Sequence, residues 1–199
     1  MRAPALSPEL QVMLAPGAGY RRLAEAAGDA GVRVLLRRPL RVALLIGAAI
    51  SLTTTGSLTA RLWPSASLCW SLVPAVQLAA GTALIAWGRR RPVALSSAVD
   101  LLFVGHGPWS LWLLAVGAIA TAQLPVGSVS WPSLWPLLAS AVVPLVWTVA
   151  IVFGFCRGVL GLDRWPAVAG TLLYELAIWG VAVAYVVVAT ARYSWGGVR

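Results

Sequence analysis

The sequence contains little charge for its length. Only 11% of the 199 residues are charged, whereas 60% are hydrophobic, and the mean hydropathy is +0.85. A soluble domain carries roughly 25% charged residues, so this chain lacks the polar surface that water on all sides would require. The shortage of charge excludes an ordinary soluble domain and favours a bundle of membrane-spanning helices.

The sequence contains no lysine, and all 15 basic residues are arginine. Together with abundant Ala, Val, Leu and Gly, this bias is typical of GC-rich coding, so we expect a bacterial source. A net charge of +9 is compatible with nucleic-acid binding, but the arginines bracket apolar segments and form no basic stripe interleaved with aromatic residues. We therefore expect no nucleic-acid partner and interpret the arginines as topology signals.

Residues that carry chemistry are equally scarce. Cys69 begins the second apolar segment and Cys156 ends the fourth, so the two thiols should lie roughly 30 Å apart, too far for a disulfide. With a single histidine and no cysteine cluster, the sequence predicts no metal site. It contains no nucleophile elbow, HExxH motif or phosphate-binding glycine loop. We expect no cofactor, no catalytic residue and no enzymatic activity.

Five apolar segments are present, each suited to crossing a membrane as a helix. They are predicted at 42–60, 67–87, 109–123, 132–155 and 166–190. Arginine-rich and arginine-poor connections alternate between them, so the positive-inside rule places the N-terminus in the cytoplasm and the C-terminus outside. The predicted fold is an all-α, polytopic transmembrane bundle of five helices in the cytoplasmic (inner) membrane of a bacterium.

The regions outside the spans divide the chain into three parts: a cytoplasmic segment at 1–39, a membrane domain at 40–192 and a short external tail at 193–199. Residues 1–39 contain no apolar run long enough for a signal-peptide core. Ser7, followed by proline and glutamate, is typical of a helix start. We expect short amphipathic helices before span 1 and before span 3, the latter at 93–104 on the membrane surface and followed by a bend.

Two features predict how the spans pack. Gly47, Ser51 and Thr55 recur every fourth residue in the first span, and such a row of small residues lets another helix approach closely. Pro144 lies inside the fourth span, where it should kink the helix.

Glu175 is the sharpest candidate for a functional residue. It lies nine residues after Pro166, about 13–14 Å along a helix and near the bilayer midplane. A charge at that depth costs roughly 2.5–3.5 kcal/mol, and such residues usually mark a pathway or a paired site. Two interpretations stay open: a structural fastener, protonated and bonded to Gln77 or to a backbone carbonyl, or a proton or ion relay.

Asp100 and His106 form the second candidate pair. If 93–104 is helical, both lie where the chain meets the lipid headgroups on the cytoplasmic side. His106 stands in a Gly-His-Gly-Pro turn, and a lone histidine in such a turn is more often a turn or interface residue than a catalytic base.

The order of these features resembles a known family. The segment MLAPGAGYRRLAE, followed by closely spaced spans, is similar to the Yip (Ypt-interacting protein) domain family, with Pro16, Tyr20, Arg22 and Leu23 at the family's positions before the first span. The stretch 152–170 is similar to the connection between the family's fourth and fifth spans. The acidic and tyrosine motif of eukaryotic members is not evident. The resemblance implies a non-enzymatic integral membrane protein.

Three functions are compatible with the sequence. The chain is a Yip-like membrane scaffold that binds lipid, a second copy of itself or another membrane protein; a small transporter or channel that uses Glu175 and Gln77; or an accessory subunit of a larger membrane complex. Five spans cannot be divided into two equal halves, so the sequence shows no inverted repeat, which is the usual sign of a transporter.

Overall fold

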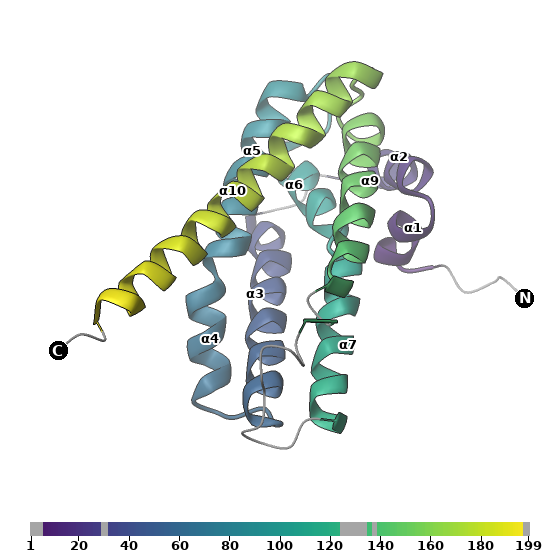
Figure 1. Ribbon diagram of the computed structural model, residues 1–199. Helices are drawn as coiled ribbons and strands as arrows, with labels where there is room; N and C mark the ends of the chain where they lie inside the picture. The colour runs from purple at the N-terminus through teal and green to yellow at the C-terminus, as the bar shows by residue number, and fades with distance from the viewer. Residues whose placement is uncertain (1–5, 29–31, 124–134, 137–138, 197–199) are drawn as a thin grey trace, which may run out of the picture.

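The computed structural model describes residues 6–28, 32–123, 135–136 and 139–196. Within these ranges every regular element is a helix, which confirms the predicted all-α class (Figure 1). The helices are α1 (Pro8–Leu14), α2 (Pro16–Ala26), α3 (Val32–Thr55), α4 (Leu62–Trp70), α5 (Leu72–Gly88), α6 (Leu95–Val104), α7 (Gly107–Gln123), α9 (Val142–Gly158) and α10 (Arg164–Gly196). The predicted start of the fourth span at 132 and the last residues of the tail lie outside the described residues.

Among the described residues, three stretches are long and apolar enough to cross a membrane. They are Leu62–Gly88, which joins α4 and α5; Leu95–Ala122, which joins α6 and α7; and Arg164–Tyr185 within α10. Helix α9 is a shorter apolar helix. These helices are those of a membrane protein, in agreement with the composition.

The N-terminal helices dock on the bundle. The start of α1 is as predicted: Pro8 is its first residue, and Ser7 Oγ accepts a hydrogen bond from the backbone N–H of Leu10 at 3.3 Å. Tyr20 of α2 is completely buried, and its ring meets Phe155 of α9 edge to face at 5.5 Å. Figure 1 shows α1 and α2 beside α9. This segment therefore belongs to the hydrophobic core of the protein.

Close contact between α2 and α9 depends on two glycines of α9. A Cβ at Gly154 would lie 2.6 Å from Pro16 Cβ, and one at Gly158 would lie 2.8 Å from Tyr20 Cβ. Only residues without a side chain leave room for α2 at these positions, and the tight approach surrounds the Tyr20 ring with protein.

Helix α6 is in the interior, so the prediction of a membrane-surface helix at 93–104 was wrong. Its buried residues include Val99, Leu102 and Phe103, each at most 3% exposed, and α6 contacts α2, α3, α5 and α9. At ten residues it is about 15 Å long, so it reaches the length of a membrane span only together with α7. Because it is apolar on nearly every side, it is most stable enclosed by longer helices.

The small-residue row of the first span holds α4 against α3, as predicted. A Cβ at Gly47 would lie 2.6 Å from the backbone nitrogen of Ser67. One turn later Ser51 is fully buried, and its Oγ donates to the carbonyl of Ser57 and accepts from the backbone N–H of Thr59. The row thus packs one helix and also fixes the turn that leads into it.

Proline separates apolar helices at two places. Pro144 was expected to kink the fourth span from within, but it lies in the first turn of α9, directly after a turn at Ala141. Pro74 has the equivalent position in α5, after the break at Ser71. A proline lacks the N–H that a helix interior needs, whereas the first turn leaves that group unpaired in any residue.

Two arginine-rich connections meet at one end of the bundle. The backbone N–H of Arg90 donates to the carbonyl of Leu160 at 2.9 Å, and Arg91 Nη1 donates to the carbonyl of Gly158 at 2.8 Å. Gly161, with φ +76°, supplies the left-handed turn beside Arg91. The connections after α5 and after α9 therefore lie on the same side of the molecule.

Candidate functional site

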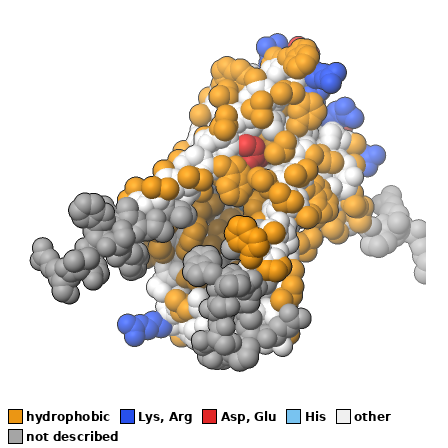
Figure 2. Space-filling view, in the orientation of Figure 1, with side chains coloured by type: hydrophobic (Ala, Val, Ile, Leu, Met, Phe, Trp, Pro, Cys, Tyr) orange, Lys and Arg blue, Asp and Glu red, His pale blue; other side chains and the backbone are white. Residues whose placement is uncertain are grey.

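A cavity of about 710 Å³ lies among the apolar helices. Its volume is within the 300–1,000 Å³ typical of small-molecule sites. Figure 2 shows the face on which α10 lies, where hydrophobic side chains cover most of the surface and the molecule is hollowed below α10. The described residues of α3 and α7 contribute most of the aliphatic lining, and α5, α9 and α10 complete it.

One polar pair in the cavity joins His106 to Gln77. His106 stands in the turn between α6 and α7, and its Nε2 lies 2.9 Å from Gln77 Oε1 on α5. The ring stacks on Phe103 at 4.8 Å and 9°, which fixes its plane. In the tautomer that carries its proton on Nε2, the ring donates to the Gln77 carbonyl oxygen and Nδ1 is an acceptor. Nδ1 is buried without a partner among the described residues.

This placement corrects the prediction for His106. The sequence placed the residue among lipid headgroups, but its partner Gln77 lies in the middle of an apolar helix and both side chains line the cavity. The difference arises because α6 enters the bundle and carries the following turn inward with it. Asp100 and His106, expected as a pair, are bonded to different residues.

Glu175 of α10 also lines the cavity. Its Oε2 accepts a hydrogen bond from Trp179 Nε1, one turn later, at 3.1 Å, and its Oε1 is buried without a partner in the described part of the chain. The expected alternative of a bond to Gln77 is not formed among the described residues, and Gln77 Oε1 is paired with His106 Nε2 instead. The structure brings Glu175, Gln77 and His106 to one cavity. Only one of the two carboxylate oxygens of Glu175 is hydrogen-bonded to a described residue.

Aromatic rings form one wall of the cavity. The rings of Trp109 and Trp179 lie 5.7 Å apart and connect α7 to α10, and Trp112 meets Trp109 edge to face at 5.7 Å. Tryptophans near the ends of apolar segments usually lie at the membrane interface, whereas Trp109 and Trp112 line the cavity. Their inward position was missed because a tryptophan that faces a cavity and one that faces lipid headgroups have the same apolar neighbours in sequence.

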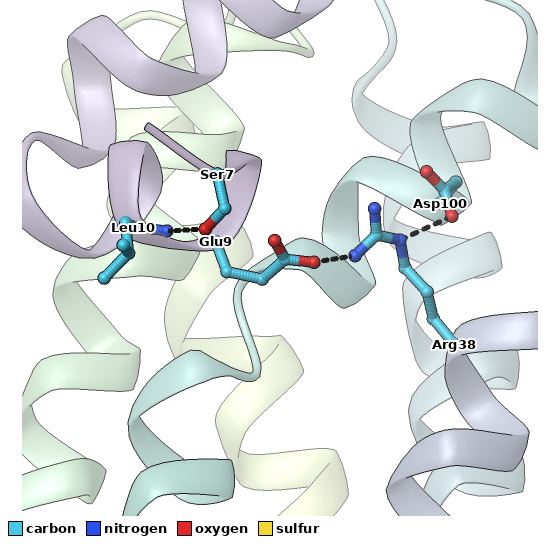
Figure 3. A network of polar contacts seen from close by, with 5 residues as sticks. All are labelled: Ser7, Glu9, Leu10, Arg38 and Asp100. Carbon is cyan, nitrogen blue, oxygen red and sulfur yellow. Dashed lines mark hydrogen bonds and ion pairs between the residues drawn. The ribbon is translucent and has the colours of Figure 1, made fainter. Parts of the chain in front are cut away.

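Asp100 belongs to an ion-pair network beside the cavity (Figure 3). Arg38 Nε donates to Asp100 Oδ1 at 2.7 Å, and Arg38 Nη1 donates to Glu9 Oε1. Arg38 of α3 therefore ties α1 to α6. Burial alone raises the pKa of the Glu9 carboxyl, but a backbone hydrogen bond and the nearby guanidinium groups of Arg38 and Arg41 outweigh it, so the pKa lies below its ordinary value.

A second hollow of about 290 Å³ is bordered by this network. Its charged lining residues are Glu9, Arg38 and Arg41. It shares four lining residues with the large cavity: Val42, Leu45, His106 and Ser110. The two hollows are therefore adjacent and both are largely apolar, but only the smaller one has arginines, Arg38 and Arg41, in its lining.

No protein-family model matches this sequence, and neither a curated protein nor a solved structure matches it. Among the described residues, no three His, Cys, Asp or Glu side chains are grouped as they would be around a metal ion.

Proposed function

We propose that this chain is a non-enzymatic integral membrane protein that binds a lipid-like molecule in the cavity between its helices. The observation that carries the proposal is the cavity itself, about 710 Å³ in volume and largely apolar, with Gln77, His106 and Glu175 as polar groups in its lining. A well-formed apolar pocket with a few convergent polar groups is the usual form of a binding site.

The chemistry of the lining selects the class of ligand. A hydrocarbon chain can move from the bilayer to the aliphatic and tryptophan side chains without leaving an apolar environment, whereas a strongly hydrated molecule would lose its water for few hydrogen bonds. His106 Nδ1 and Glu175 Oε1 have no partner among the described residues. Because each unmet group is costly in an apolar environment, a hydroxyl or amide of the ligand that reached either atom would stabilise the complex.

We place the protein in the inner membrane with five spans, a cytoplasmic N-terminus and an external C-terminus. Contact between the arginine-rich connections after α5 and after α9 supports a shared cytoplasmic side. The Yip-like character is part of the proposal. Pro16 and Tyr20 contact Gly154 and Gly158, so the two stretches that carry the resemblance pack against each other.

Cavity-filling variants test the proposal. Ala182 on α10 lines the cavity, whereas Ala177, on the same helix, is exposed and does not line it. The purified protein should retain lipid, measured by native mass spectrometry in a mild detergent. Ala182→Phe should reduce the retained lipid several-fold, and Ala177→Phe should leave it unchanged. Equal retention by both variants, with both folded, would contradict binding in the cavity.

A second function, proton-coupled transport, is favoured by one observation. Glu175 has an oxygen that no described residue bonds and lies at the border of a cavity, and an intramembrane acid of this kind is a candidate relay. Flux of protons into liposomes, followed with an internal pH dye, should then fall to the background level in Glu175→Gln. A flux that is absent from the wild type, or unchanged in the variant, rejects transport.

A further inference from the structure

We infer that the smaller hollow is a headgroup site, which binds the phosphate of an anionic lipid while a hydrocarbon chain of the same molecule lies in the large cavity. The inference rests on the proposed function and names its ligand class. It assigns Arg41, which no sequence motif singles out, as the residue that contacts the phosphate.

The two hollows share a single face of α3. Arg38, Arg41, Val42 and Leu45 border the smaller hollow. The large cavity is lined from α3 by residues 42, 45, 46, 49, 50, 53 and 54. Steps of three and four residues keep positions on one side of a helix, so the charged and apolar linings form one continuous stripe.

The length of this stripe suits a lipid. From Arg41 to Thr53 the helix rises about 18 Å, and one leaflet of a bilayer has a hydrocarbon layer of about 15 Å. A lipid that lay along α3 with its phosphate at Arg41 would therefore place its chain against the apolar part of the same face. A water-soluble phosphate compound would leave that apolar part empty.

The charges of the smaller hollow point to Arg41. Arg38 is bonded to two carboxylates, those of Glu9 and Asp100, so its guanidinium is already engaged within the protein. Arg41 borders the same hollow and forms no ion pair with a described residue. A guanidinium donates parallel hydrogen bonds that match the oxygens of a phosphate. Arg38 fixes the wall of the site, and Arg41, which acts on the Glu9 carboxyl through its charge but forms no ion pair with a described residue, provides the cation for the phosphate.

The test measures binding of three probes to the full-length protein in an uncharged detergent. Dioleoylphosphatidylglycerol contains both the phosphate and the chains, dioleoylglycerol contains the chains alone, and glycerol 3-phosphate contains the phosphate alone. We expect the first to bind most tightly, the second more weakly and the third not measurably. In Arg41→Gln the affinity for the phospholipid should fall about five-fold or more, to that of dioleoylglycerol, whose own affinity should not change.

Arg37→Gln is the matched control, because Arg37 is exposed one turn before Arg41 in α3 and borders neither hollow. It should keep the wild-type affinity. Arg41→Lys, which retains the charge and loses the paired donors, should give an intermediate affinity and shows whether a folded variant at this position still binds.

Each contrary result has a distinct meaning. Equal losses in Arg37→Gln and Arg41→Gln would show general attraction to a basic surface and overturn the headgroup site. Tight binding of glycerol 3-phosphate would overturn it in favour of a soluble phosphate ligand. If Ala182→Phe abolishes binding of both lipids while Arg41→Gln changes nothing, the cavity is a binding site and the headgroup site is rejected. If Ala182→Phe binds both lipids as the wild type does, the proposed function fails as well.

Discussion

The contact between α3 and α4 at Gly47 allows a quantitative prediction for Gly47→Ala. The new Cβ would lie 2.6 Å from the backbone nitrogen of Ser67 and 2.8 Å from its Cα. The nitrogen must move by about 0.8 Å to reach ordinary contact at 3.4 Å, and a gap of this size forfeits a quarter to a half of the dispersion energy of the atoms around it. Because backbone cannot rotate away as a side chain does, the two helices must separate.

We expect Gly47→Ala to lower the free energy of unfolding by about 2 kcal/mol, which corresponds to a decrease in Tm of about 4–8 °C for a chain of this size. The assay is thermal unfolding of the purified protein in detergent, followed by circular dichroism. Gly180→Ala is the control, since nothing lies within 4 Å of a Cβ at Gly180. Alanine stabilises a helix interior by up to about 1 kcal/mol relative to glycine, so the Tm of this variant should rise slightly or stay constant.

A second substitution separates side-chain from backbone crowding. In Gly47→Ala combined with Ser67→Gly, the Ser67 hydroxyl is removed, but the backbone nitrogen and Cα of residue 67 keep their positions. The double variant should therefore recover only part of the lost Tm. If Gly47→Ala alone unfolds at the wild-type temperature, the close approach of α3 and α4 is refuted.

Three further predictions concern other parts of the protein. The pKa of the Glu9 carboxyl is lowered in the folded state. Its contribution to the free energy of unfolding is therefore complete above the unfolded-state pKa and is lost as pH falls through the folded-state pKa. Glu9→Gln should therefore lower the free energy of unfolding by less than about 1 kcal/mol at pH 7, as is usual for a partly exposed ion pair, and this loss should vanish in acid. The measurement is denaturant unfolding of both proteins at several pH values. A difference in stability that grew toward acid pH would contradict the pairing. Gly161→Ala should cost about 1–2 kcal/mol, because φ at this position is +76°; an unchanged unfolding midpoint would be the contrary result. A maleimide should modify the exposed Cys69 in the folded protein and reach the buried Cys156 only after denaturation, which mass spectrometry of timed samples can check, and equal rates would argue against this packing.

Local features of the fold were accessible from the sequence. Ser7 caps α1 as predicted, because a hydroxyl before proline and glutamate satisfies backbone groups within one turn. Gly47 packs against α4 because a missing side chain permits close approach wherever a partner helix passes. The apolar stretches were recognised by composition alone.

The candidate site was accessible only in part. Glu175, Gln77 and His106 were singled out because polar groups in apolar segments are costly, and the three line one cavity. Their partners were not predicted: His106 is bonded to Gln77, and Glu175 to Trp179. These pairings depend on the depth at which α6 enters the bundle, which local sequence does not specify.

The sequence by itself determined an all-helical chain with apolar helices, arginine-marked connections and a capped N-terminal helix. Only the tertiary structure decided that α6 is enclosed by protein, that Arg38 joins Glu9 to Asp100, and that a hollow bordered by Arg38 and Arg41 adjoins a larger cavity along α3. The physical reason is that the interior of a helix bundle and the surrounding lipid are both apolar. An apolar residue therefore has the same sequence signature in either place, and only the packing of the helices separates the two.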